Sequence, residues 1–166
     1  MFTIRKATVA DCELIHKMAK EVFPCHLQGN FISRTTGLYD GLDVCSLPMY
    51  ANKWRKKDMC ISIAYKENEP CGYVSIQQQE KDVFHLQKIY VLPRFQGTHC
   101  GSFLFKEAIK CIKEIHPEPC LMELNVNRNN KALQFYEHMG MRKLREGDFP
   151  IGNGYYMNDY IMGLDI

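Results

Sequence analysis

The stretch that most constrains the fold is a glycine-containing turn between a strand pattern and a helix pattern. It reads Arg94-Phe-Gln-Gly-Thr-His-Cys-Gly-Ser102. Residues 83–91 before it alternate apolar side chains, which predicts a strand, and residues 101–115 after it repeat them at helical spacing. Gly97 and Gly101 let the backbone approach a ligand closely, and the unpaired N–H groups of a helix start attract anions. This predicts a phosphate-binding turn; the alternative is an ordinary strand-to-helix connection.

A second motif narrows the choice, because the turn has neither the Walker sequence nor the dinucleotide G-x-G-x-x-G spacing. It lies at residues 124–141, Leu-Asn-Val-Asn-Arg-Asn-Asn-Lys-Ala-Leu-Gln-Phe-Tyr-Glu-His-Met-Gly-Met. We interpret it as a strand end, an Asn-rich turn and a helix that carries Tyr136 and stops at Gly140.

The rest of the chain predicts alternating strands and helices. Strands are expected over residues 2–9, 60–66, 71–79, 83–91, 120–126, 141–147 and 155–164, and helices over 11–23, 101–115 and 130–139.

Together the two motifs resemble the GNAT superfamily of acyl-CoA N-acetyltransferases. Residues 84–113 resemble its pyrophosphate loop with the flanking strand and helix, residues 121–141 its next strand and helix, and residues 2–9 its first strand. The resemblance implies an α/β fold, with a central mixed and twisted sheet of about seven strands flanked by helices. It also implies one N-acetyltransferase domain over residues 1–166.

The resemblance implies that the chain binds acetyl-CoA as co-substrate. Backbone N–H groups of residues 96–102 would bind the pyrophosphate, and residues 89–91 would pair with the pantetheine arm like an added strand. The implied set is Ile89, Tyr90, Val91, Gln96, Gly97, Thr98, His99, Cys100, Gly101, Ser102 and Asn129.

Two of these loop residues are unusual. His99 stands where the family has its middle glycine, so it must adopt a backbone conformation permitted there; it could also add a charge-assisted contact to phosphate. Cys100 could be a nucleophile whose pKa the helix dipole lowers. The alternative for Cys100 is a small side chain that the loop accommodates.

Tyr136 matches the family's tyrosine, which would protonate the departing thiolate; a core tyrosine is the alternative. The base is less defined, because Gln87 stands where many members carry a glutamate. His85 shares a strand face with Gln87 and is the candidate base, against a solvent-facing histidine or a water relay. Glu80, Asp82 and Glu123 are weaker candidates.

The resemblance implies transfer of acetyl from acetyl-CoA to a primary amine by direct attack. The tail over residues 148–162 resembles the closing hairpin of a bacterial subgroup with polyamine-type acetyltransferases, so a small amine or polyamine is the first expectation. Asp148 and Asp159 could attract a cationic amine or simply serve turns and strand ends. A peptide or protein N-terminus, and a CoA-binding module without turnover, are the alternatives.

Composition excludes other classes. The 166-residue chain has a net charge of +2, which gives no reason to expect nucleic acid, and it has no run of ~18 apolar residues for a membrane span. Its eight cysteines form no C-x-x-C pair, so no metal is expected. We expect a cytoplasmic protein with reduced thiols, and a homodimer is a further possibility.

Residues 25–60 are atypical, since they lack a steady helical period where the family has helices over the substrate. Synonymous codons for residues 31–44, read one base later, give Leu-Ser-Pro-Glu-Gln-Leu-Asp-Tyr-Met-Met-Asp-Trp-Met, a capped amphipathic helix pattern. We hypothesise that the segment is frame-shifted relative to the family; the alternative is a divergent loop.

Overall fold

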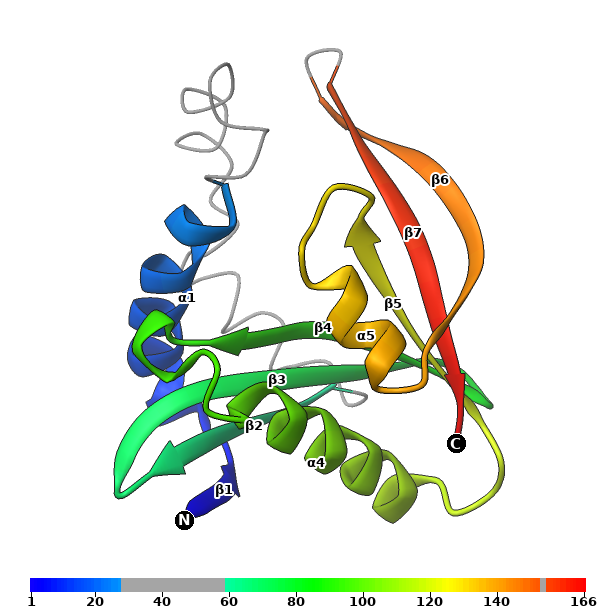
Figure 1. Cartoon of the computed structure of the whole chain (residues 1–166). Helices are drawn as coiled ribbons and strands as arrows, with labels where there is room; N and C mark the ends of the chain where they lie inside the picture. Colours follow the sequence, from blue (N-terminus) through cyan, green and yellow to red (C-terminus); the bar gives the residue numbers. More distant parts are fainter. Residues whose placement is uncertain (28–58, 153–154) are drawn as a thin grey trace.

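The computed structural model describes residues 1–27, 59–152 and 155–166 (Figure 1). The frame-shift hypothesis concerns residues outside these ranges, apart from the ends of the segment, which complete a helix and begin a strand. The elements are β1 (Phe2–Lys6), η1 (Val9–Asp11), α1 (Cys12–Leu27), β2 (Met59–Lys66), β3 (Glu69–Glu80), β4 (Val83–Val91), η2 (Pro93–Phe95), α4 (Cys100–Ile115), β5 (Leu121–Asn127), α5 (Leu133–His138), β6 (Arg142–Gly152) and β7 (Tyr155–Asp165).

The strands form one seven-stranded sheet in the order β1-β2-β3-β4-β5-β7-β6. All neighbours are antiparallel except β4 and β5, which are parallel and are joined through α4. The predicted mixed sheet with flanking helices is therefore confirmed.

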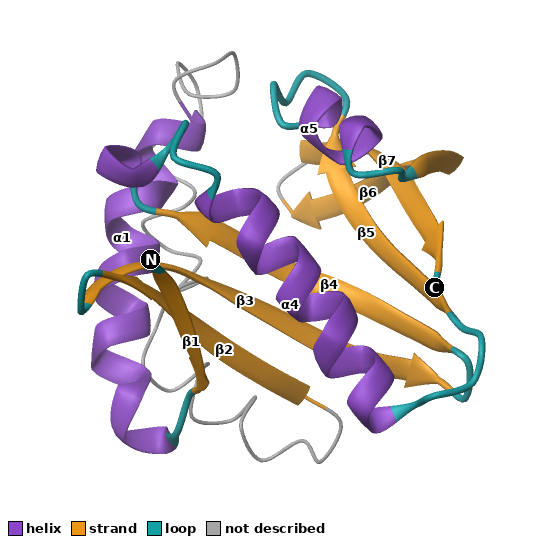
Figure 2. Ribbon diagram, turned by 60° about the horizontal axis from the view of Figure 1, so that its bottom comes forward, coloured by secondary structure: helices purple, strands orange, loops and turns teal. Residues whose placement is uncertain are grey.

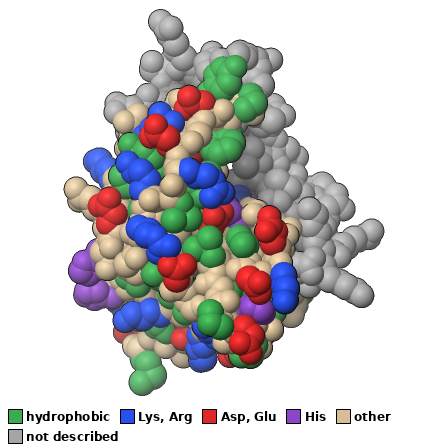
Figure 3. All heavy atoms as spheres, turned by 90° about the vertical axis from the view of Figure 1, so that its right-hand side faces the viewer, with side chains coloured by type: hydrophobic (Ala, Val, Ile, Leu, Met, Phe, Trp, Pro, Cys, Tyr) green, Lys and Arg blue, Asp and Glu red, His purple; other side chains and the backbone are tan. Residues whose placement is uncertain are grey.

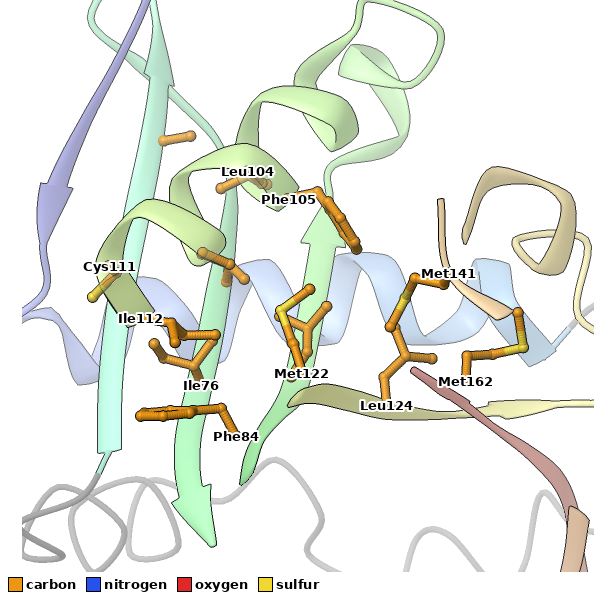
Figure 4. Packing of buried hydrophobic residues seen from close by; sticks show 14 of the residues in the cluster. Ile76, Phe84, Leu104, Phe105, Cys111, Ile112, Met122, Leu124, Met141 and Met162 are labelled. Atoms are coloured by element: carbon orange, nitrogen blue, oxygen red, sulfur yellow. The ribbon is translucent and has the colours of Figure 1, made fainter. Parts of the chain in front are cut away.

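The helices cover both faces of the sheet. Helix α4 lies across one face of β2, β3 and β4, and α1 lies behind the opposite face (Figures 2 and 4). The core under α4 includes Ile76, Phe84, Leu104, Phe105, Ile112, Met122, Leu124, Met141 and Met162. The core under α1 includes Ile15, Met18, Ala19, Val22, Ile61, Ile63, Tyr73 and Leu92.

Two elements are shorter than predicted. The first strand ends at Lys6 rather than residue 9, because the Thr8 N–H donates to Asp11 Oδ2 (2.8 Å) and closes the η1 turn before α1. The helix expected over 130–139 begins at Leu133, because the Ala132 N–H donates to Asn130 Oδ1 (2.9 Å) and holds the preceding residues in an Asx turn.

Charged side chains of both signs are interspersed on the face seen from the right of Figure 1 (Figure 3). Within the described ranges, no helix combines the length and apolar character that crossing a membrane requires.

Candidate active site

The turn between β4 and α4 leaves a row of backbone N–H groups without acceptors. Among the described residues, no acceptor is found for the amides of Gly97, His99, Cys100, Gly101 and Ser102, whereas Phe103 N–H donates to the His99 carbonyl (3.0 Å) and begins the helical pattern. A helix start of this kind carries partial positive charge and suits an anion. The predicted phosphate turn thus has free donors at five of its seven predicted positions. The prediction was wrong for Gln96 and Thr98, whose N–H groups already donate to the Pro93 (3.2 Å) and Phe95 (3.3 Å) carbonyls within the turn.

The left-handed backbone of two residues produces this arrangement. Gly97 has φ +75°, and His99, the residue that caps α4, has φ 66°. His99 therefore adopts the conformation that a glycine takes more easily, at a cost of roughly 1–2 kcal/mol. A histidine can stand at the position of the family's glycine because its cost is limited to this backbone strain. The His99 side chain itself lies at the surface.

A gap opens in the sheet beside this turn. Strands β4 and β5 pair only from Val83↔Leu121 to His85↔Glu123, although β4 continues to Val91 and β5 to Asn127. The two strands diverge visibly beyond that point (Figures 1 and 2). The three predicted pantetheine-binding residues, Ile89 to Val91, lie on β4 alongside the gap. The Gln96 side-chain Nε2 donates to the Val91 carbonyl (3.4 Å) and ties the turn to the strand end.

Tyr136 lies on α5, the helix that comes directly after β5 in the chain, and β5 forms one side of the gap (Figure 1). Phe135 positions the helix: its ring meets Tyr136 and Phe105 edge to face, with centroids 5.3 and 6.2 Å apart. A Cβ at Gly101 would lie 3.5 Å from the Phe135 ring, so the starts of α4 and α5 pack together. Burial raises the pKa of the Tyr136 phenol, and the Tyr90 phenol adds to this rise.

A surface hollow of about 610 Å³ adjoins the turn. His99 and Ser102 from the turn lie in it, together with Phe2, Phe103, Lys106, His138 and Met139. Sequence reasoning missed Lys106, although the signal was present: it stands one helical turn after Ser102, on the same face of α4. Its ammonium adds a positive charge beside the unpaired amides.

His85 lies on the sheet face opposite α4, at the last paired position before the gap. Its Nε2 is 3.1 Å from Asn125 Oδ1, and its Nδ1 is buried without a partner among the described residues. The Gln87 amide donates to Gln77 (3.3 Å). Glu123, a weaker candidate base, accepts two hydrogen bonds from Arg145 (3.0 and 3.1 Å), so its carboxylate is occupied.

The remaining site residues differ in what they can do. Cys100 is only 1% exposed, and burial and the Cys71 thiol raise its pKa, which opposes the nucleophile alternative. Thr98 donates from its hydroxyl to the Phe95 carbonyl (2.6 Å) and stiffens the turn. The Asn129 N–H donates to Asn127 Oδ1 (3.0 Å), so Asn129 lies in the turn after β5. The described residues contain no cluster of His, Cys, Asp and Glu that could hold a metal ion.

Solved structures share this architecture. The PaiA N-acetyltransferase from Thermoplasma acidophilum in complex with coenzyme A has a TM-score of 0.80 at 19% identity, covering 100% of this chain and 99% of that one. A ribosomal-protein alanine N-acetyltransferase from Escherichia coli has a TM-score of 0.73 at 17% identity, covering 100% and 94%. A chimera of the Vibrio cholerae spermidine N-acetyltransferase SpeG and hSSAT has a TM-score of 0.73 at 18% identity, covering 99% and 95%.

A search of curated proteins found no sequence match. The family described as "Acetyltransferase (GNAT) domain" matches residues 42–155, which is more than half of the chain. The match includes the turn, the gap and α5. The chain belongs to the GNAT acetyltransferase family.

Proposed function

We propose that the protein transfers acetyl from acetyl-CoA to a primary amine by direct attack, within one domain over residues 1–166. The observation that carries the proposal is the row of acceptor-free amides at the start of α4, set beside the gap between β4 and β5. A diphosphate needs several donors at one point, and an extended thiol arm needs an exposed strand edge. Both requirements are met side by side.

Acetyl-CoA supplies the activated acyl group; the chain's own residues hold it. The amides of Gly97 and of residues 99–102 bind the diphosphate, with Lys106 as the nearby cation. The β4 backbone at Ile89 to Val91 pairs with the pantetheine arm and orients the carbonyl for attack.

Two protons leave the acceptor ammonium as it becomes an amide. His85 takes the first at Nδ1, which makes the amine a nucleophile. Tyr136 gives a proton to the departing sulfur and is restored by the second proton of the attacking nitrogen. The raised pKa of the Tyr136 phenol supports this assignment, because the group stays protonated at neutral pH.

The test is turnover with an amine panel. Purified protein is incubated with acetyl-CoA and, separately, butylamine, putrescine, spermidine or a short peptide with a free N-terminus, and the CoA thiol released is followed. We expect thiol release that depends on at least one amine, with the acetylated amine found by mass spectrometry.

The panel separates the proposal from its rivals. Turnover only with the peptide would favour the N-terminal acetyltransferase that the Escherichia coli neighbour suggests. Binding of CoA without turnover of any amine would leave a CoA-binding module and contradict the proposal.

A further inference from the structure

Three polar side chains form a line across the sheet on the face opposite α4. They are His85 on β4, Asn125 on β5 and Asp159 on β7. On β5 and β7 the alternate residues Leu124, Val126 and Met162 point into the core under α4, so Asn125 and Asp159 point the other way. His85 Nε2 is 3.1 Å from Asn125 Oδ1, and hydrogen bonding from the Asn125 side chain acts to lower the pKa of Asp159. The line borders the point where β4 and β5 separate.

The line ends in two acceptor atoms without partners. Asp159 is 2% exposed, yet its Oδ1 has no hydrogen-bond partner among the described residues, and the same holds for His85 Nδ1. With His85 Nε2–H donating to the Asn125 oxygen, the Asn125 amide nitrogen donates to Asp159, and Nδ1 carries a lone pair. Asn125 itself is exposed, so a solute can approach the line there. Two unfilled acceptors complement a group with several N–H donors.

The charges around the line leave one carboxylate uncompensated. Glu123 is paired with Arg145, and Asp148 with Arg128 (3.0 Å) and the Asn158 amide (2.7 Å). Burial raises the pKa of Asp159. The Asn125 hydrogen bond and the charge of Arg128 both act to lower this pKa, but their combined effect is smaller than that of burial. The buried carboxylate therefore destabilises the fold when ionised. Such a residue is expected where a ligand needs it.

We propose that Asp159 is the specificity-determining residue of the acceptor site, where its Oδ1 binds the ammonium of a primary amine that carries no carboxylate. Asn125 is a positioning residue that holds Asp159 and His85 in register. This rests on the proposed function, since it assigns the acceptor side of the same gap. Three carboxylates against two guanidiniums leave one negative charge, which matches one ammonium.

The test measures amine binding without turnover, by calorimetry on the protein saturated with CoA. The probes are butylamine and γ-aminobutyrate, which adds a carboxylate to a similar carbon chain. We expect the wild type to prefer butylamine and Asp159→Asn to bind it about tenfold to a hundredfold more weakly, with much of the preference lost. Asp165→Asn, which removes an exposed carboxylate of the same strand that is paired with Arg142 (2.6 Å) and is not part of this charge count, is the matched control and should bind like the wild type.

Melting temperature shows whether Asp159→Asn is folded. The folded pKa of Asp159 is raised, so its contribution to stability is fully present below the ordinary value of about 4 and is lost as pH rises. Asp159→Asn should therefore melt higher than the wild type at pH 7, and this gain should shrink toward pH 4.

The outcomes separate this inference from the proposed function. If the wild type turns over an amine, and a folded Asp159→Asn protein binds butylamine with unchanged affinity, the inference is overturned and the proposed function stands. Butylamine binding that needs Asp159, without turnover, would support the inference and overturn the proposed function. No butylamine binding to the wild type would overturn the inference.

Discussion

At the scale of single residues, the environment of Tyr136 favours a donor rather than an acceptor of protons. Apolar packing against Phe135 disfavours the phenolate, and burial raises the pKa of the phenol. An acid whose pKa lies above 10 remains protonated throughout the neutral range. Loss of rate at alkaline pH below 10 would therefore come from another group.

Replacement of Tyr136 by Phe should separate its chemistry from its packing. The ring stays and only the hydroxyl is lost, so we expect kcat to fall about 100-fold, the lower range for loss of a general acid, with an unchanged Kd for CoA. Stopped-assay rates and calorimetry measure the two quantities. Tyr65→Phe is the control: it removes a phenol on β2, which accepts from Arg5 at 2.8 Å, and should keep its rate. Equal rates for Tyr136→Phe and wild type would remove Tyr136 from the mechanism.

Residue identity alone predicted part of the backbone geometry of the turn. Gly97 and His99 both take a positive φ, as the turn requires, whereas Gly101 lies inside α4 without one. The line from His85 to Asp159 was not predictable, because its residues come from three strands far apart in the sequence. Only the sheet register brings Asn125 near Asp159, which pairs with Asn127 two residues further along β5.

At the scale of elements, the junction of β1 and α1 is fixed by one carboxylate. Asp11 accepts from the Arg5 guanidinium (2.6 and 2.9 Å) and from the Thr8 N–H (2.8 Å). These hydrogen bonds lower the pKa of Asp11 below its ordinary value. The bond from Arg5 has the largest effect, and the bond from the Thr8 N–H has the next largest. A carboxyl group whose pKa is lower in the folded than in the unfolded state stabilises the fold at pH values above its unfolded-state pKa. This contribution is lost as the pH falls through the folded-state pKa.

The variant Asp11→Asn keeps an oxygen for the Thr8 N–H but loses the charge paired with Arg5, so it should be less stable at pH 7 by up to about 1 kcal/mol, the upper range for an exposed ion pair. For a chain of this size that is roughly 2–4 °C in Tm. The deficit should narrow as pH falls below about 4, where the wild-type carboxylate begins to lose its own contribution. Thermal melts at several pH values measure it.

Glu13→Gln is the matched control for this experiment. Glu13 pairs with Lys17 on the exposed surface of α1 (3.1 Å, both side chains 72% exposed), so its loss should change the stability by less than about 0.5 kcal/mol. A deficit of Asp11→Asn that stayed constant with pH would contradict the electrostatic account of the junction.

The presence of each helix and strand was predictable because each segment has a clear hydrophobic period. Residues 83–91 were predicted as a strand with the bounds that β4 has, and 101–115 differs from α4 by one residue. The errors arose where side chains cap the backbone, at Asp11 and Asn130. Local competition of this kind leaves little trace in hydrophobic periodicity.

At the scale of the whole molecule, the split between β4 and β5 connects the two faces of the sheet. The amides of the turn and Tyr136 lie toward the α4 and α5 side, and the line from His85 to Asp159 lies on the other. In the proposed reaction, acyl donor and acceptor therefore approach from opposite faces and meet in the gap. The sequence motifs predicted the donor half. The strand order, which places β7 between β5 and β6, brings Asp159 beside β5 and so forms the proposed acceptor half.

The most direct test of this account is an amide NMR titration of the ¹⁵N-labelled protein with CoA, with pantetheine, which lacks the diphosphate, as the comparison. The account predicts large shifts of the Gly97, Gly101 and Ser102 amides with CoA and small ones with pantetheine, because these N–H groups gain an anionic acceptor only from the diphosphate. CoA binding that left these amides in place, or no binding at all, would contradict it.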